Sequence, residues 1–207
     1  DFFINDEMER FPAGSCGGKI DWGWVQHIYS SLNVSGKAAV VLDTGATSRG
    51  SGSQGSNKEK DCRKWFVDND LIEGVIYLPE NLFYNTSAPG IILFLNKSKQ
   101  FKNKIYLLHA GKMYEKGDPK NFIPESSIEY ISSTYRALRE VDKFARFISN
   151  AEIVKNDYNI SPSRYIQIND SEVYRPIPEI VDELNALEEE AAIYNEKLKS
   201  IIEKLAL

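Results

Sequence analysis

The sequence predicts an α/β fold whose sheet is mixed and incomplete, and three patterns support this prediction. Short apolar runs at 74–78 and 91–95 are rich in β-branched and aromatic residues, as buried strands are. Strand patterns alternate with helical patterns along the chain, which is typical of βαβ units and a largely parallel sheet. A nucleotide-binding sheet usually begins with a strand that leads into a Gly-rich turn, and no such strand precedes the first helix here.

Two helices are expected in the first third of the chain, because apolar residues recur there at helical spacing. Asp21 can cap the first helix. The apolar stripe of this helix comprises Trp24, Val25, Ile28, Tyr29 and Leu32. The second helix is expected over 58–69, and the residues that it turns inward are Cys62, Trp65 and Phe66.

A strand and a flexible segment are expected between these helices. Residues 37–43 (KAAVVLD) show no polar alternation, which predicts a strand buried on both faces. Residues 44–57 are rich in Gly and Ser and are expected to be flexible. Farther along, 91–95 and 105–109 are expected to close the sheet as an antiparallel hairpin, since the connection between them is short and polar. Its lysines, Lys97, Lys99, Lys102 and Lys104, are most simply a solvated hairpin tip.

The last part of the chain predicts a long helix with a narrow apolar seam. Its positions alternate at steps of four and three: Ile180, Leu184, Leu187, Ala191, Tyr194, Leu198, Ile201 and Leu205. Pro178 and nearby acids suit the start of a helix. The seam either packs on its own domain or binds a partner helix. We therefore expect three regions: an α/β domain at 1–124, a helical and irregular extension at 125–178, and the heptad helix at 179–207.

The charge distribution argues against a DNA-binding surface that acts alone. The whole net charge of −5 lies in the heptad helix, and the acids and bases of the remaining chain cancel. Phosphate affinity depends mainly on clustered Lys and Arg, so any contact with nucleic acid would need help from a partner. Hydrophobic residues make up 42% of the chain, enough for a globular core.

Location and metal content follow from other features. The first ten residues are acidic where a secretory signal would be basic, and no apolar run could span a bilayer, so we expect a cytoplasmic protein with no membrane partner. Cys16 and Cys62 lack a CxxC pattern, which favours free thiols and no metal site. His27 and His109 have no nucleophile motif beside them and are expected to be structural.

Two short motifs resemble known sites but lack their context. Asp43, Thr44 and Gly45 match the signature of retroviral-type aspartic proteases, yet those enzymes pair two aspartates and no second copy exists here. The glycines at 50–55 (GSGSQG) fit a dinucleotide-binding string, yet no tight turn joins a strand to a helix there. Neither motif supports an activity.

The loop between the strands at 74–78 and 91–95 is the unusual part of the sequence. It is polar and rich in turn residues, but Leu82, Phe83 and Tyr84 lie in its middle. Large apolar side chains on a loop are costly to expose, so this loop either fills a core or lines a pocket.

Three stretches resemble the modification (methyltransferase) subunit of type I restriction-modification systems, an adenine-specific DNA methyltransferase family. They are LDTGATSRGSGSQG, DNDLIEGVIYLPENLFYNTSAPGIILFLNK and KNDYNISPSRYI. The resemblance implies a partial Rossmann-like methyltransferase sheet followed by a C-terminal helical region. It also implies that the Gly-rich turn for S-adenosylmethionine and the Asn-Pro-Pro-aromatic motif lie outside these residues, so we expect no catalytic residue here and an inactive fragment.

The resemblance also assigns roles to the loop and to the final helix. In this family a target adenine is flipped out of the duplex and gripped by aromatic and polar groups. Phe83 matches the stacking aromatic, with Tyr84 and Asn85 as flanking substrate-binding residues; the alternative is that Phe83 is a core residue. Expected partners are DNA and the specificity and restriction subunits, and the final helix would dock onto the specificity subunit. A second hypothesis is a non-catalytic module that assembles a complex through this helix.

The chain departs from the family at the end of its first strand. Asp43 and Thr44 stand where members usually have Pro or Ala followed by Asn or His. A role for this strand end near the cofactor is therefore not expected.

Overall fold

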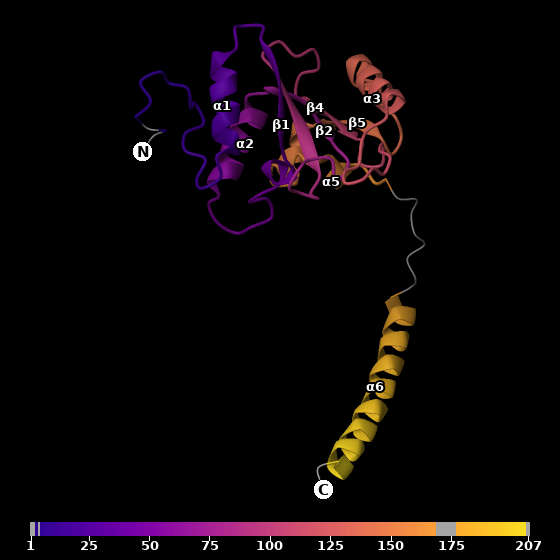
Figure 1. Ribbon diagram of the computed structural model, residues 1–207. Helices are drawn as coiled ribbons and strands as arrows, with labels where there is room; N and C mark the ends of the chain where they lie inside the picture. Colours follow the sequence, from indigo (N-terminus) through magenta and orange to yellow (C-terminus); the bar gives the residue numbers. More distant parts are fainter. Residues whose placement is uncertain (1–2, 4, 169–176, 206–207) are drawn as a thin grey trace. The chain divides into compact units, whose positions relative to one another are not determined.

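The computed structural model describes residue 3, residues 5–168 and residues 177–205. They form two compact units, Asp1–Ile168 and Asn169–Leu207, and the second contains a single long helix among its described residues (Figure 1). In chain order the elements are α1 (Asp21–Ser31), β1 (Lys37–Asp43), the 3-10 helix η1 (Thr44–Thr47), α2 (Lys58–Asp68), β2 (Ile72–Tyr77), β3 (Gly90–Asn96), β4 (Lys104–His109), α3 (Glu125–Ala137), β5 (Ala145–Ser149), α4 (Asn150–Lys155), α5 (Pro162–Tyr165) and α6 (Ile177–Leu205).

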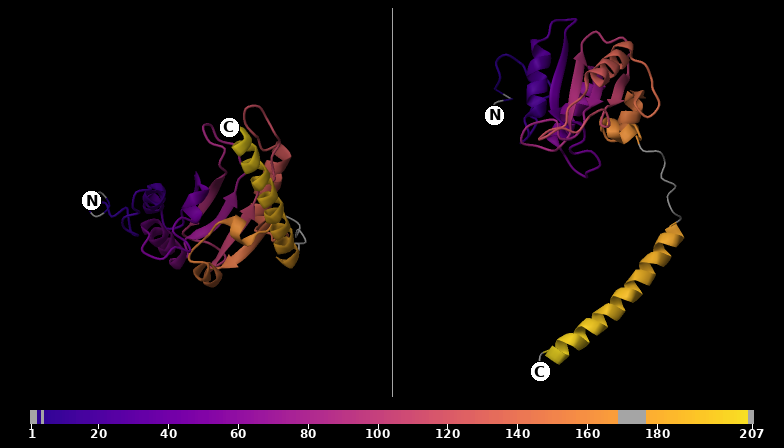
Figure 2. Two further views of the ribbon diagram at one scale, coloured as in Figure 1. Left: turned by 90° about the horizontal axis from the view of Figure 1, so that it is seen from below. Right: turned by 45° about the vertical axis from the view of Figure 1, so that its right-hand side comes forward.

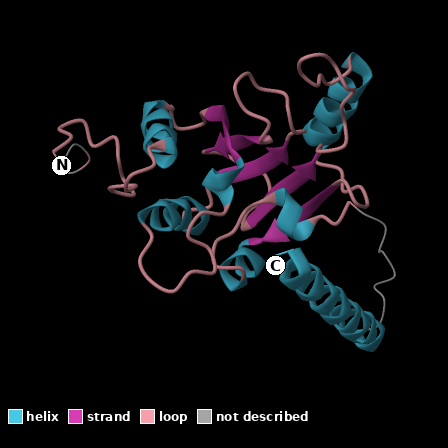
Figure 3. Cartoon of the chain, turned by 60° about the horizontal axis from the view of Figure 1, so that its bottom comes forward, coloured by secondary structure: helices cyan, strands magenta, loops and turns pink. Residues whose placement is uncertain are grey.

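The sheet is mixed, as predicted, but its strands pair differently from the prediction. The order is β1-β3-β2-β4-β5, and the strands lie side by side in Figure 3. β3 is antiparallel to both β1 and β2, β5 is antiparallel to β4, and only β2 and β4 pair in parallel. The prediction of a largely parallel sheet was therefore wrong, and so was the hairpin of 91–95 with 105–109. β2 inserts between these two strands, because β3 turns back along β2 before β4 begins.

The strand β1 lies at an edge of the sheet and is not buried on both faces as predicted. Its residues alternate between exposed and half-buried, and Val41 is 57% exposed. Small and β-branched residues without polar alternation fit a buried strand, but they also fit an edge strand with one uncovered face. The inner strand β4, between β2 and β5, instead has the continuous burial expected of a core strand.

Each face of the sheet carries its own apolar cluster. On one face α1, α2, α4 and α5 cover a cluster that includes Trp22, Phe66, Val75 and Leu107. On the other face α3 covers a smaller cluster. Its fully or largely buried members are Ile76, Leu78, Tyr106, Leu108, Ala110, Ile131 and Ala145. The two views agree that α1 and α2 lie on the side opposite α3 (Figures 1 and 2).

The helix α1 spans Asp21–Ser31, but Asp21 does not cap it as predicted: the N-cap is Ile20, without a side-chain cap bond. The helix also buries a different tryptophan. Trp22 is almost fully buried, whereas Trp24 is 59% exposed. Gln26 of α1 is also buried. Its side-chain amide donates to the Gly14 carbonyl and its side-chain oxygen accepts from the Ala13 amide, so the N-terminal segment is bound to the helix. The buried face is therefore rotated relative to the predicted stripe, because a polar residue takes one of its positions.

The boundary that the sequence placed at residue 124 does not divide the structure. The pattern at 127–148 predicted one helical region, but α3 ends at Ala137, where Leu138 adopts a left-handed conformation (φ 47°). The chain then returns as β5, which pairs with β4 from Ser149 to Ala145. The region 125–168 thus completes the same sheet and belongs to the first unit.

The predicted heptad helix is present as α6. Its seam residues Ile180, Leu184, Leu187, Tyr194 and Leu198 are each about half exposed. The side chains of Ile201 and Leu205, like residues 169–176 of the predicted extension and 206–207, lie outside the described residues. Across the part of the chain that the structure describes, no helix has the length and apolar content needed to cross a membrane.

Candidate functional site

Three loops leave the sheet at the same end, where the strands β1, β2 and β4 finish. β1, β2 and β4 run in one direction, and the pairing of Asp43 with Gly90 and of Tyr77 with both Ile91 and His109 aligns their carboxyl ends. The loops that follow these strands, 44–57, 78–89 and 110–124, therefore leave the sheet together. Ligands of open α/β sheets bind outside the carboxyl ends of the strands, so this end of the sheet is the candidate site.

The loop 78–89 carries the predicted substrate-binding residues. Phe83 is half-buried and packs with Leu82 against the cluster under α3, while Tyr84 is 83% exposed and Asn85 is also exposed. The Phe83 ring lies over Gly90 at the start of β3, and a Cβ at Gly90 would stand 2.6 Å from its Cε2 atom. The structure thus places Phe83 between a core position and the surface, and it places Tyr84 outward.

A stacked pair of rings lies beside this loop. Tyr77 and His109 face each other with ring centroids 4.4 Å apart, at the ends of the parallel pair β2 and β4. His109 is buried, and this burial lowers its pKa. The amide of Gly111 donates to Nδ1 at 3.2 Å, so a neutral ring carries its proton on Nε2. These contacts agree with the structural role expected for His109.

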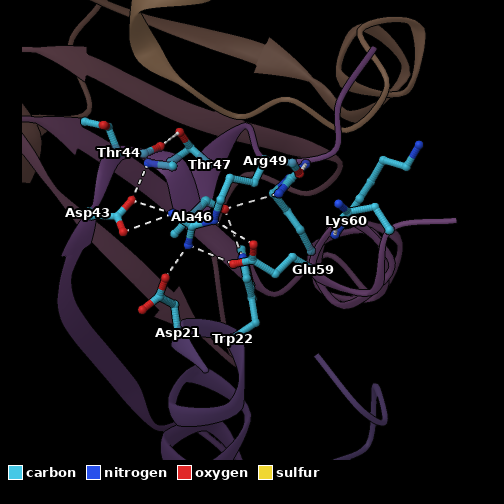
Figure 4. Close-up of polar contacts among 12 residues, drawn as sticks. Asp21, Trp22, Asp43, Thr44, Ala46, Thr47, Arg49, Glu59 and Lys60 are labelled. Carbon is cyan, nitrogen blue, oxygen red and sulfur yellow. Dashed lines mark hydrogen bonds and ion pairs between the residues drawn. The ribbon is translucent and has the colours of Figure 1, made fainter. Parts of the chain in front are cut away.

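The loop after β1 is held by one arginine that the sequence did not indicate. The Arg49 guanidinium contacts carboxylates from three elements (Figure 4): Asp21 of α1, Asp43 of β1 and Glu59 of α2. Its Nε donates to Glu59 at 2.6 Å and its Nη1 to Asp43 at 2.8 Å. These bonds, with Glu59 first, raise the pKa of Arg49 and keep the guanidinium charged.

Asp43 has a structural role in this cluster. Burial opposes its ionisation, but the bonds from Arg49 and from the Gly45 amide outweigh burial and lower the pKa of the carboxyl. The carboxylate caps η1 by accepting from the Gly45 amide. A β-carbon on Gly45 would collide with the Arg49 guanidinium, so the guanidinium packs directly on the backbone at this strand end.

A second arginine, Arg63 of α2, binds the same segment after β1. Arg63 is fully buried, and burial lowers its pKa to about 10. Its guanidinium donates to the carbonyls of Tyr158 (2.6 Å), Arg49 (3.0 Å) and Ala46 (3.2 Å) and to the Ser51 hydroxyl (2.8 Å). The segment 44–51, which the sequence predicted to be flexible, is therefore bound to α2 and to the chain near Tyr158. An isolated arginine on a polar helix gives no sequence signal for such a role.

The two cysteines meet in the core. The Sγ atoms of Cys16 and Cys62 lie 2.8 Å apart, and both thiols are free and buried. The amide of Gln26 donates to Cys16 at 3.0 Å. Within the described ranges no group of His, Cys, Asp and Glu residues could hold a metal ion.

Comparison with known proteins identifies the family. A family model described as N-6 DNA Methylase matches residues 4–173. The MjaVIII methylase subunit of a type I restriction enzyme from Methanocaldococcus jannaschii is 41% identical over 190 residues, covering 89% of this chain and 32% of that protein. The HindI methylase subunit from Haemophilus influenzae is 31% identical over 212 residues, covering 97% of this chain and 47% of that protein.

Solved structures agree with this relationship. The type I methyltransferase subunit from Streptococcus thermophilus is 32% identical with a TM-score of 0.70, over 80% of this chain and 34% of that one. The EcoKI M protein, at 18% identity and a TM-score of 0.57, shares the fold over 86% of this chain and 44% of that one. The chain spans about a third of the length of the first curated relatives it matches. By the extent of the family match, this chain belongs to the N-6 DNA methylase family, and its relatives there are methylase subunits of type I restriction enzymes.

Proposed function

We propose that this chain is part of the methyltransferase subunit of a type I restriction-modification system, and that its loop 78–89 holds the target base. The reaction would transfer a methyl group from S-adenosylmethionine to the exocyclic amine of an adenine flipped out of DNA. The observation that carries the proposal is the position of Phe83, half-buried on a loop at the carboxyl ends of the strands in a chain of this family.

Stacking explains why such a loop needs a supported aromatic ring. A base inside a duplex is inaccessible to the enzyme, and extruding it costs a few kcal/mol of stacking and pairing. An aromatic face returns roughly 1–3 kcal/mol when the base stacks on it. The ring of Phe83 is already held in place by Gly90 and by the cluster under α3. Stacking of a base would therefore cost little further loss of side-chain freedom. Tyr84 and Asn85 would flank the base.

The chain supplies one part of this chemistry. S-adenosylmethionine would bind mostly outside it, since the end of β1 is occupied by Arg49, and no catalytic residue is assigned within it. We therefore expect the isolated chain to be inactive. The complete subunit would act in the cytoplasm with the specificity and restriction subunits and with DNA.

The second candidate is a non-catalytic module that assembles a complex through α6. Its support is the seam of half-exposed apolar residues along that helix, including Leu184 and Leu187. A helix with one narrow apolar stripe gains stability by packing on a partner helix. The two candidates differ in what they require of Phe83, which lies in the other unit.

Replacing Phe83 in the complete subunit distinguishes them. Phe83→Ala should lower methylation of an otherwise normal DNA substrate by roughly 5- to 150-fold, through loss of about 1–3 kcal/mol of stacking, and leave assembly with the other subunits intact. Phe101→Ala is the matched control, because Phe101 is also partly exposed but lies in the β3–β4 connection at the opposite edge of the sheet. Full methylation by Phe83→Ala would remove the base-holding role and favour the assembly module.

A further inference from the structure

The loop 78–89 is braced by a neighbouring segment. The ammonium of Lys120 donates to the side-chain oxygen of Asn81 at 3.0 Å and to the Thr86 carbonyl at 3.2 Å. Asn121 follows with its backbone amide bonded to the Asn81 carbonyl and its side-chain amide bonded to the Glu80 carbonyl, both at 3.0 Å. Lys120 therefore contacts the loop on both sides of Phe83, and Asn121 contacts it on the side that precedes Phe83.

The segment that supplies these donors is itself well supported. Glu115 and Phe122 exchange two backbone hydrogen bonds, which closes the turn containing Lys120. A side chain at Gly117 would collide with the Lys120 carbonyl, so the turn packs tightly at that point. Met113 and Ile123 pack on the same apolar cluster as Leu82 and Phe83. The segment 113–123 and the loop 78–89 thus pack on the same apolar cluster.

The loop has little structure of its own to set its shape. It contains no helix or strand, and its internal bonds are Asn81 amide to Ser87 carbonyl and Ala88 amide to Thr86 hydroxyl. Asn81 and Asn85 both adopt left-handed conformations (φ 55° and 62°), which asparagine tolerates better than most residues. Lys120 donates to neutral oxygens on both sides of Phe83, so it adds a second link between residues 81 and 86, beside the backbone bond from Asn81 to Ser87.

We propose that Lys120 is a positioning residue that holds the Phe83 loop in the shape needed to receive a flipped base. The inference rests on the proposed function. It assigns Lys120 no contact with DNA and no proton transfer: its role is to keep the ring of Phe83 in place before the base arrives. Removing it should therefore slow methyl transfer and leave DNA affinity unchanged.

The test uses the complete methyltransferase complex and measures kcat, KM for DNA and Tm. Lys120→Met should lower kcat roughly tenfold through loss of its charge-assisted hydrogen bonds. KM and Tm should stay near their starting values, and Lys120→Arg should restore most of kcat, because a guanidinium can also donate to two oxygens. Lys116→Met, which changes an exposed lysine of the same segment, should have no effect.

A second variant removes the contact from the other side. Asn81→Gly deletes the acceptor while tolerating the positive φ, so it should lower kcat, and combining it with Lys120→Met should add little. It also tests the proposal if Lys120→Met fails to assemble. Equal kcat for Lys120→Met and Lys116→Met would overturn the positioning role when Phe83→Ala lowers methylation. If Phe83→Ala keeps full activity, the proposed function fails instead.

Discussion

A methyl group at residue 90 should dislodge Phe83, and the structure sets the size of the effect. In Gly90→Ala the new Cβ would stand 2.6 Å and 3.1 Å from ring atoms of Phe83, whereas carbon atoms prefer about 3.5–4.0 Å. β3 cannot withdraw, because it is paired on both sides, with Asp43 opposite Gly90 and Tyr77 opposite Ile91. The ring must therefore move by about 1 Å or leave its place.

Such overpacking typically costs about 1–3 kcal/mol, and 1.4 kcal/mol is a factor of ten in an equilibrium. The free energy of unfolding of the chain, measured with denaturant, should fall by that amount. Gly18→Ala is the matched control, since nothing lies within 4 Å of a Cβ there, and it should change stability by less than about 0.5 kcal/mol. Unchanged stability in Gly90→Ala, with the Phe83 ring still against residue 90 by NMR, would refute the packing described here.

Three further predictions concern the rest of the chain. Arg63→Met leaves the carbonyls of Arg49 and Tyr158 without their donor and should cost about 2–4 kcal/mol of unfolding free energy. Lys58→Met, at an exposed lysine of α2, is the control and should be nearly neutral; equal losses would contradict the role of Arg63. Burial lowers the pKa of His109 from 6.5, so the unfolded chain binds a proton on this histidine at a higher pH than the folded chain does. Stability should therefore fall as pH drops below about 6.5. His109→Gln should flatten that slope between about pH 7 and pH 5. Carboxyls with lowered pKa values, such as Asp43, contribute only below this window, nearer 3.8. The pair Leu184→Asp and Leu187→Asp should abolish co-purification with the specificity subunit without changing the Tm of the first unit, whereas Val181→Asp, off the seam, should leave assembly intact.

The sequence predicted where the strands lie more reliably than which strands pair with each other. Residues 72–77 and 90–96 form strands where short β-branched runs predicted them. Pairing depends on contacts that local patterns do not encode, so the insertion of β2 between β3 and β4 was missed. The strand β5 was missed for a related reason: Val141, Phe144 and Phe147 recur at the three-residue spacing of a helix, whereas α3 ends at Ala137, where Leu138 adopts a left-handed conformation.

The candidate site was predicted in part. Its aromatic residues stand out in the sequence because Leu82, Phe83 and Tyr84 are unusual in a polar loop. The residues that hold it in place do not stand out: Arg49 gathers carboxylates from three separate elements, and Lys120 reaches a loop almost forty residues away. Single charged residues are usually solvated, so only the fold reveals which of them support a site.

The most direct test of the base-holding role compares two DNA substrates in single-turnover methylation by the complete complex. One carries the target adenine paired with thymine, and the other carries it in a mismatch, which lowers the cost of flipping. If Phe83 stabilises the flipped base, Phe83→Ala should lose much more activity on the paired target than on the mismatched one, while Phe101→Ala loses none on either. An equal loss on both targets, or no loss, would contradict the central claim.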